Sequence, residues 1–287
     1  MSPYTEQILI CTGKDDWPSK IEDENEGENL AADFKQLLSR GGAYADPYHN
    51  LSVINSSFPS SRTNGESTSS SLYLLPSFKY VPFVRGSSDI NQLVKGYLQP
   101  DKLHPAHEAL SPQIRDRLTR DKKELESLEG GLHDINNILV LICGHGGRDA
   151  RCGKYGPVLR DEFEKGLERN DFRVSKDAVN VSFRVNDGPD TQLDPIENDH
   201  NRLPIARVGL ISHIGGHKFA GNTIIYLPPK MKTQTGGSHP LAGCGIWYGR
   251  VEPKHVDGIL KETILGGKVI EELFRGGIRQ DKEIMRL

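Results

Sequence analysis

This chain of 287 residues contains two apolar strands, and each is followed at once by a glycine-rich loop that carries a pair of metal-binding side chains. These two segments limit the possible folds and functions of the chain more than any other feature. The stretch 139–152 reads LVLICGHGGRDARC and contains Cys143 and Cys152. The stretch 207–222 reads RVGLISHIGGHKFAGN and contains His213 and His217. Short apolar runs that end at glycine are typical of buried strands. Two thiols and two imidazoles at two strand ends therefore predict a metal site with four ligands.

The ligand types favour a [2Fe–2S] cluster. Iron–sulfur clusters are held by thiolates, and two histidines can replace two of the cysteines on one iron, which raises the reduction potential. Both loops are also dense in glycine, which lets a backbone pass close to a bound group. The four proposed ligands are Cys143, Cys152, His213 and His217.

Other metal chemistry competes with this interpretation. The H-x3-H spacing of the histidines is compatible with zinc, but eight residues separate the two cysteines, whereas zinc sites commonly place two to four between them. Gly215 and Gly216 lie between the histidines, and the glutamate of the helical H-E-x-x-H motif is missing, which argues against a zinc hydrolase. A structural zinc site and a redox disulfide with unrelated histidines remain open.

The remaining cysteines and histidines receive simpler interpretations. His145 lies inside the first loop, and we expect it to support the ligands rather than replace one. Cys11 is expected in the core, and Cys244 is either a small buried residue or a free thiol near the cluster. Polar surroundings predict three surface histidines: His200, His239 and His255. Three cations flank the ligands and either offset cluster charge, meet an acidic partner or are simply solvated: Arg148, Arg151 and Lys218.

Composition excludes several classes of protein. The 36 basic and 39 acidic side chains give a net charge of −3, so the chain lacks the basic surface expected of a nucleic-acid-binding protein. No apolar run approaches the roughly 18 residues that span a bilayer, so we expect no membrane insertion. Four cysteines are too few for a disulfide-built scaffold of this length.

The order of strands and helices predicts an α/β fold made by a degenerate duplication. Residues 8–17, ILICTGKDDW, resemble residues 140–149, VLICGHGGRD, and only the second copy carries the ligand set. We predict an N-terminal domain without a cluster (1–99), a helical connector (100–132) and a C-terminal cluster-binding domain (133–287).

Patterning within these parts predicts the individual elements. Expected strands are 7–11, 51–55, 137–143, 179–185, 207–212, 222–227 and, as the last strand, 245–251. Residues 72–84 are also extended, with Pro76 and Pro82 confining them to edge strands or turns. Expected helices are 30–40, 90–98, 157–168 with proline in its first turn, and 253–265.

Several long motifs of the second half resemble the sucrase/ferredoxin-like family, in particular its thioredoxin-like ferredoxin domain. They are LICGHGGRDARCG, RVGLISHIGGHKFAGNTIIYLP and GIWYGRVEPKHVDGIL. In the first half, LICTGKDDWPSKIE and YLLPSFKYVPFV resemble the fungal mitochondrial branch of the same family. The resemblance implies two thioredoxin-like halves, the cluster ligands named above, and a mitochondrial protein linked to thiol and redox homeostasis, with a protein redox partner.

The functional hypothesis is one-electron transfer, with the cysteines on one iron and the histidines on the other. Loss of an imidazole proton on oxidation would couple that electron to a proton, so the potential should fall as pH rises. One alternative is a thiol oxidoreductase acting on protein cysteines, which the absence of a C-x-x-C motif weakens. Another is a scaffold with structural zinc. No nucleotide-binding G-x-G-x-x-G fingerprint is present, so a reductase would be a separate protein.

Overall fold

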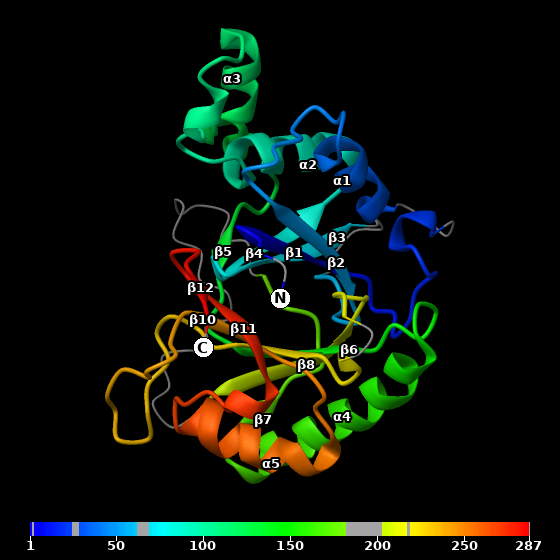
Figure 1. The fold of residues 1–287 in the computed structure, drawn as a ribbon, viewed down its shortest axis with the longest axis vertical. Helices are drawn as coiled ribbons and strands as arrows, with labels where there is room; N and C mark the ends of the chain where they lie inside the picture. Colours follow the sequence, from blue (N-terminus) through cyan, green and yellow to red (C-terminus); the bar gives the residue numbers. More distant parts are fainter. Residues whose placement is uncertain (2, 25–28, 62–68, 182–202, 217–218, 287) are drawn as a thin grey trace.

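The computed structural model describes residues 1, 3–24, 29–61, 69–181, 203–216 and 219–286. Its helices lie on two outer sides and its strands lie between them (Figure 1). Among the described residues, no helix is long and apolar enough to cross a membrane.

The first half begins with a strand, a helix and a second strand. Asn29 caps the helix α1 by accepting a hydrogen bond from the backbone N–H of Ala32 through its side chain, and Phe34 anchors the helix in the core. The elements of this half are β1 (Glu6–Cys11), η1 (Ile21–Asp23), α1 (Leu30–Leu38), β2 (Leu51–Ser56), β3 (Ser70–Leu75), β4 (Lys79–Val84), α2 (Gly86–Leu93) and the π-helix η2 (Val94–Leu98).

A stretch of short helices leads into the second half. It consists of η3 (Pro105–His107), α3 (Pro112–Leu118), η4 (Lys122–Ser127) and the short strand β5 (His133–Asp134). The second half then contains β6 (Ile138–Cys143), α4 (Ala150–Arg169), β7 (Arg173–Val174), β8 (Ile205–Ile211), β9 (Thr223–Tyr226), β10 (Cys244–Tyr248), η6 (Pro253–His255), α5 (Val256–Ile259), the π-helix η7 (Leu260–Leu265), η8 (Glu271–Leu273), β11 (Phe274–Arg279) and β12 (Ile284–Met285).

The two halves repeat one topology. The strand order is β2-β1-β3-β4 in the first and β8-β6-β9-β10 in the second. In each, the first pair is parallel and the next two pairings are antiparallel. In each, the fourth strand precedes an α-helix that continues as a π-helix. The predicted fold class, α/β with two thioredoxin-like halves, is confirmed; the exact domain boundaries remain a prediction.

Strands β2 and β8 join the halves into one twelve-stranded sheet. They run antiparallel and pair at Ser56 and Ile211. On either side of this pair, Ser57 N–H donates to Leu210 O and Ser212 N–H donates to Asn55 O, both at 2.9 Å. The ends of the second strand of each half therefore meet at one point.

Alternation along the strands turns side chains to both faces of each half-sheet, and three cores result. Ile8 and Ile10 pack beneath α1 and α2, whereas Leu9 belongs to a central core shared with Leu139 and Leu141 of the other half. Val140 of β6 belongs to a third core, beneath α4 and α5. The molecule thus has four layers, with helices outside and the two half-sheets facing each other (Figure 1).

A buried polar chain crosses the central core. Trp247 Nε1 donates to Tyr4 Oη at 3.1 Å, and Tyr226 Oη donates to Gln7 Oε1 at 3.1 Å. Because the Tyr226 proton is used there, Tyr4 Oη donates to Tyr226 Oη across 2.6 Å. Burial raises the pKa of both tyrosines, so both remain neutral and able to donate. Each half contributes two members, so this chain links the halves.

Three of the predicted strands need correction. Residues 72–84 are not confined to edge strands and turns, because β3 lies between β1 and β4, and β4 lies between β3 and β5. Pro76 falls in the turn after β3, so it removes no ladder hydrogen bond. The strand 245–251 is not the last one, since β11 and β12 follow it. Of the strand predicted at 179–185, residues 179–181 form no strand, and residues 182–185 lie outside the described residues.

Candidate metal centre

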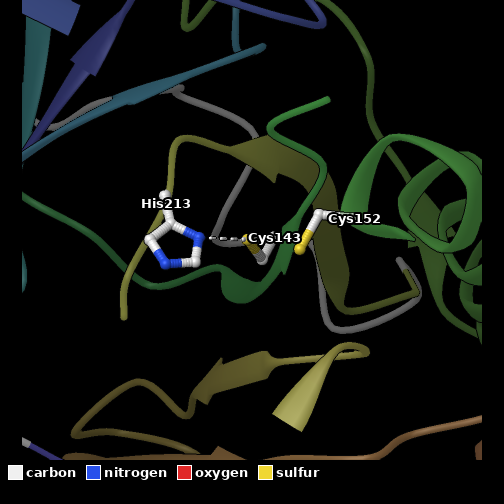
Figure 2. Close-up of side chains that lie close together, drawn as sticks. All are labelled: Cys143, Cys152 and His213. Atoms are coloured by element: carbon white, nitrogen blue, oxygen red, sulfur yellow. Dashed lines mark hydrogen bonds between the residues drawn. The ribbon is translucent and has the colours of Figure 1, made fainter. Parts of the chain in front are cut away.

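Three of the four predicted ligands converge where β6 and β8 end. These strands are parallel and pair Cys143 with Ile211, which places His213 two residues beyond the end of β8. Cys152 approaches from the first turn of α4 (Figure 2). The ligand atoms of Cys143, Cys152 and His213 all lie within 4.8 Å of one another. The fourth predicted ligand, His217, lies outside the described residues.

The three side chains differ in exposure. Both sulfurs belong to fully buried cysteines, and His213 is half-buried. The Nδ1 atom of His213 faces Cys143 Sγ at 3.8 Å (Figure 2). The arrangement therefore combines two soft, water-excluded donors with one nitrogen donor nearer the surface, which suits zinc or an iron–sulfur cluster rather than a hard cation.

Cys152 is placed by a helix that starts earlier than predicted. The sequence pattern predicts a start at Pro157, but α4 begins at Ala150, because the Asp149 side chain accepts from Arg151 N–H at 3.0 Å and caps the helix. Gly153, inside the helix, is required by packing: a Cβ atom there would lie 2.8 Å from the Cα of Gly146. The glycines that suggested a loop instead let α4 lie directly against the loop that follows β6.

The two thiols differ in how readily they lose a proton. The hydrogen bond from Cys152 holds the pKa of Cys143 below its usual value, and the backbone N–H groups of His145 and Ile214 act in the same direction against burial. The same hydrogen bond, followed by burial, raises the pKa of Cys152. Of the two thiols, Cys143 is therefore the one that loses its proton more readily, which favours the thiolate form that a metal requires.

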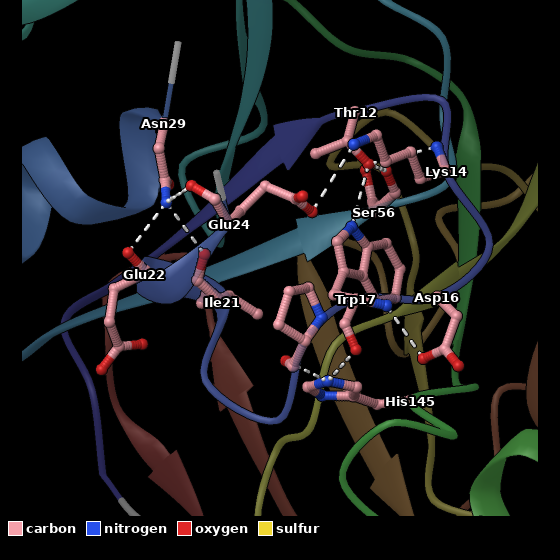
Figure 3. A network of polar contacts seen from close by, with 11 residues as sticks. Thr12, Lys14, Asp16, Trp17, Ile21, Glu22, Glu24, Asn29, Ser56 and His145 are labelled. Atoms are coloured by element: carbon pink, nitrogen blue, oxygen red, sulfur yellow. Dashed lines mark hydrogen bonds and ion pairs between the residues drawn. The ribbon is translucent and has the colours of Figure 1, made fainter. Parts of the chain in front are cut away.

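His145 connects this site to the first half of the chain. The residue is 1% exposed, and its Nδ1 accepts a hydrogen bond from the backbone N–H of His213 at 3.0 Å. Its Nε2 lies 3.0 Å from the carbonyl oxygen of Trp17 and 2.8 Å from that of Pro18 (Figure 3). Since carbonyl oxygens only accept, Nε2 carries the proton. His145 is therefore held as one neutral tautomer, and the expectation that it supports the ligands agrees with this geometry.

The loop of residues 14–19, which follows β1, covers the loop after β6. Both carboxylate oxygens of Asp16 accept from Gly147 N–H, at 3.2 and 3.1 Å. The indole of Trp17 is 4% exposed and meets the His145 ring edge-on, with ring centroids 5.9 Å apart. Arg148 of the loop after β6 donates to Ser19 at 3.1 Å, and Arg160 of α4 donates to Asp15 at 2.7 Å. Sequence patterns gave no sign of this contact.

Arg275 also lies close to the site, although no sequence pattern indicates it. It lies on β11, its guanidinium carbon is 4.3 Å from the centre of the Phe219 ring, and it donates to the side-chain oxygen of Asn222. Burial lowers the pKa of Arg275, and the nearby charge of Cys143 opposes that shift. Asn222 in turn accepts from the backbone N–H of Cys143 at 2.9 Å. Arg275 thus holds Asn222 in place beside Cys143 and puts a positive charge near the sulfurs.

The other candidate residues lie as follows. All four cysteines are free and buried, which agrees with a core role for Cys11 and Cys244. His239 was predicted at the surface but is 3% exposed, because the turn it occupies folds back to bond with Met231 O. His255 is half-buried and accepts from Glu252 N–H. Arg148 and Arg151 are exposed, whereas His200 and Lys218 lie outside the described residues.

Comparison with known proteins places these features in a family context. The model of the family described as sucrase/ferredoxin-like matches residues 1–276. No solved structure matches the chain significantly.

Relatives named "Altered inheritance of mitochondria protein 32" are similar to the chain. The protein of Debaryomyces hansenii is 33% identical over 96% of this chain and 83% of its own length. That of Meyerozyma guilliermondii is 31% identical over 71% of this chain and 56% of its own length. That of Clavispora lusitaniae is 37% identical over 50% of this chain and 36% of its own length.

Proposed function

The chain belongs to the sucrase/ferredoxin-like family, and on that premise we propose that it binds one [2Fe–2S] cluster and transfers single electrons. The ligands are Cys143 and Cys152 on one iron and His213 and His217 on the other. The observation that carries this proposal is the meeting of two buried sulfurs and one imidazole within 4.8 Å, at the ends of two parallel strands.

The surrounding residues suit that role. Such a cluster supplies a one-electron couple whose potential is raised by histidine ligation. Burial excludes water from both sulfurs, and the lowered pKa of Cys143 favours formation of the thiolate that a metal requires. His213 presents Nδ1 to the sulfurs, so Nε2 is the atom at which a proton would be held or released. We therefore propose proton-coupled transfer, with a potential that falls as pH rises; a pH-independent potential would contradict it.

The names of the relatives support a mitochondrial role. We propose that the chain acts in mitochondria, in thiol and redox homeostasis, and exchanges electrons with a protein partner. The half-buried His213 is the described ligand nearest the surface, so a partner would approach on its side.

Metal and sulfide analysis tests the cluster. We expect anaerobically purified protein to show visible charge-transfer bands, with about two iron and two acid-labile sulfide per chain. Cys143→Ser should abolish the bands, whereas Cys244→Ser should retain them, because Cys244 is a buried cysteine outside the ligand group. About one zinc per chain with no sulfide would instead establish a structural zinc site that uses the same side chains.

A thiol oxidoreductase that uses Cys143 and Cys152 is the second candidate. The hydrogen bond between the two thiols and the lowered pKa of Cys143 favour it, because an attacking thiolate with a neighbouring thiol is what disulfide exchange requires. The discriminating assay is disulfide reduction by the metal-free chain. Turnover that exceeds that of free dithiothreitol and disappears in Cys143→Ser would favour this candidate.

A further inference from the structure

We infer that the 14–19 loop of the first half is part of the metal site. It holds in place the loop between β6 and α4 (144–149, the ligand loop) and, through His145, positions the backbone of His213 for ligation. This inference rests on the proposed function only in that the site binds a metal. It applies equally to a cluster and to a zinc ion. It also assigns a purpose to a half that carries no ligand of its own.

The duplication explains how the two loops come to meet. The 14–19 loop follows Cys11 at the end of β1, as the ligand loop follows Cys143 at the end of β6. Phe58 stands two residues after β2, where the second copy has His213 two residues after β8. Phe58 is 4% exposed and packs against Gly209, where a Cβ atom would lie 2.7 Å from the ring. The first copy thus has a packed phenylalanine where the second has a predicted ligand, and the 14–19 loop of the first copy lies on the ligand loop of the second.

Backbone contact sets the distance between the loops. A Cβ atom added to Gly147 would lie closer to the Trp17 carbonyl oxygen than any real contact allows. At Gly146, an added Cβ would lie 2.8 Å from Asp16 Oδ2. Only glycine at these positions lets Asp16 reach Gly147 N–H. The two adjacent glycines therefore serve the approach of the first half, in addition to any approach of a metal.

His145 carries this contact to the ligand. Its Nε2 donates to the carbonyl oxygens of Trp17 and Pro18, and its Nδ1 accepts from the backbone N–H of His213. A shift of the 14–19 loop would therefore move the imidazole, and with it the backbone of a ligand. Groups that orient metal ligands in this way are commonly worth about 10–100-fold in metal affinity. His145 and Asp16 are positioning residues of the site.

The first experiment pairs two glycine substitutions in the full chain. Gly147→Ala should force the loops apart, whereas Gly258→Ala, the matched control, adds a methyl group where nothing lies within 4 Å. We expect Gly147→Ala to lose its bound metal to a chelator about 10–100-fold faster than the control, with an altered midpoint potential where iron is bound. Equal rates and equal potentials in the two folded variants would overturn the inference.

Asp16→Ala keeps the test decisive if Gly147→Ala does not fold. Asp16 is exposed, so its removal leaves the core intact; Asp161→Ala, an exposed aspartate on α4, is the control. In the metal-free chain, hydrogen exchange should accelerate at the amides of both Gly147 and His213 in Asp16→Ala and at neither in the control. Faster exchange at Gly147 alone would overturn the coupling to the ligand. Because this arm needs no metal, it separates failure of the inference from failure of the cluster proposal.

Two substitutions of His145 separate its roles. Asparagine places an acceptor near the position of Nδ1, and glutamine places a donor near that of Nε2. Because asparagine keeps an acceptor for the His213 N–H, His145→Gln should accelerate exchange of that amide more than His145→Asn does. Both should accelerate loss of bound metal, because each breaks one link of the chain from Trp17 to His213. A His213 amide that exchanges at the wild-type rate in His145→Gln would contradict the role assigned to Nδ1.

Discussion

Substitution of Tyr226 by phenylalanine tests how the halves are held together. The Tyr226 hydroxyl is fully buried, donates to Gln7 Oε1 at 3.1 Å and accepts from Tyr4 Oη at 2.6 Å. Its removal leaves the Gln7 oxygen without a donor and the Tyr4 proton without an acceptor. Each orphaned buried group costs about 1–3 kcal/mol, so we expect the free energy of unfolding to fall by about 2–6 kcal/mol.

Urea unfolding, followed by tryptophan fluorescence and by far-ultraviolet circular dichroism at equal metal content, measures this loss. Tyr155→Phe is the matched control, because Tyr155 is 45% exposed, and we expect it to stay within about 0.5 kcal/mol of the wild type. A Tyr226→Phe variant that also stays within about 0.5 kcal/mol would refute the reasoning, since the polar chain would then contribute nothing that water cannot replace.

Two further predictions concern the cores. Burial raises the pKa of the Cys11 thiol from 9.0 to about 12, so between these pH values the thiol is ionised in the unfolded chain but not in the folded chain. The free energy of unfolding should therefore fall by about 1.4 kcal/mol per pH unit over that range. Urea unfolding at pH 8 and near pH 11 should show a smaller fall in Cys11→Ala than in the wild type. Phe163 is a fully buried residue of α4, so Phe163→Ala should cost about 3–5 kcal/mol in guanidinium unfolding, and a cost below about 1 kcal/mol would contradict its place in the core.

The convergence of three of the predicted ligands could be foreseen because it depends on local pattern and on one topological rule. Apolar runs ending at Cys143 and just before His213 identified β6 and β8. Parallel neighbours bring their carboxyl ends to the same edge of a sheet, which is where the two loops meet. The fold class followed from the repeat of strand and loop in each half.

The elements that were missed are those in which tertiary contacts override local preference. The start of α4 contains Gly153 and Gly156, and glycine costs about 1 kcal/mol in a helix interior, so the sequence favours a loop there. The contact with Gly146 and Gly144 explains these glycines, but it exists only in the folded chain. β11 likewise contains Gly276 and Gly277, which have low strand propensity, and it forms because it pairs with β10.

The coupling of His145 to the first half could not be predicted from the sequence. Trp17 and His145 are 128 positions apart, and the bond joins a ring nitrogen to a backbone carbonyl, which leaves no trace in residue types. The pair Gly146–Gly147 suggested close approach of a bound group, whereas in the structure it also admits another part of the chain. Only the fold distinguishes these two reasons for glycine.

Pulsed electron paramagnetic resonance of the dithionite-reduced protein, with nitrogen-15 in its histidines, tests the central claim most directly. The account predicts a spin-half [2Fe–2S] signal coupled to about two histidine nitrogens, one of which disappears in His213→Cys while the cluster remains. A reduced cluster without histidine coupling would contradict the ligand set. A silent sample that contains about one zinc per chain would contradict the cluster itself.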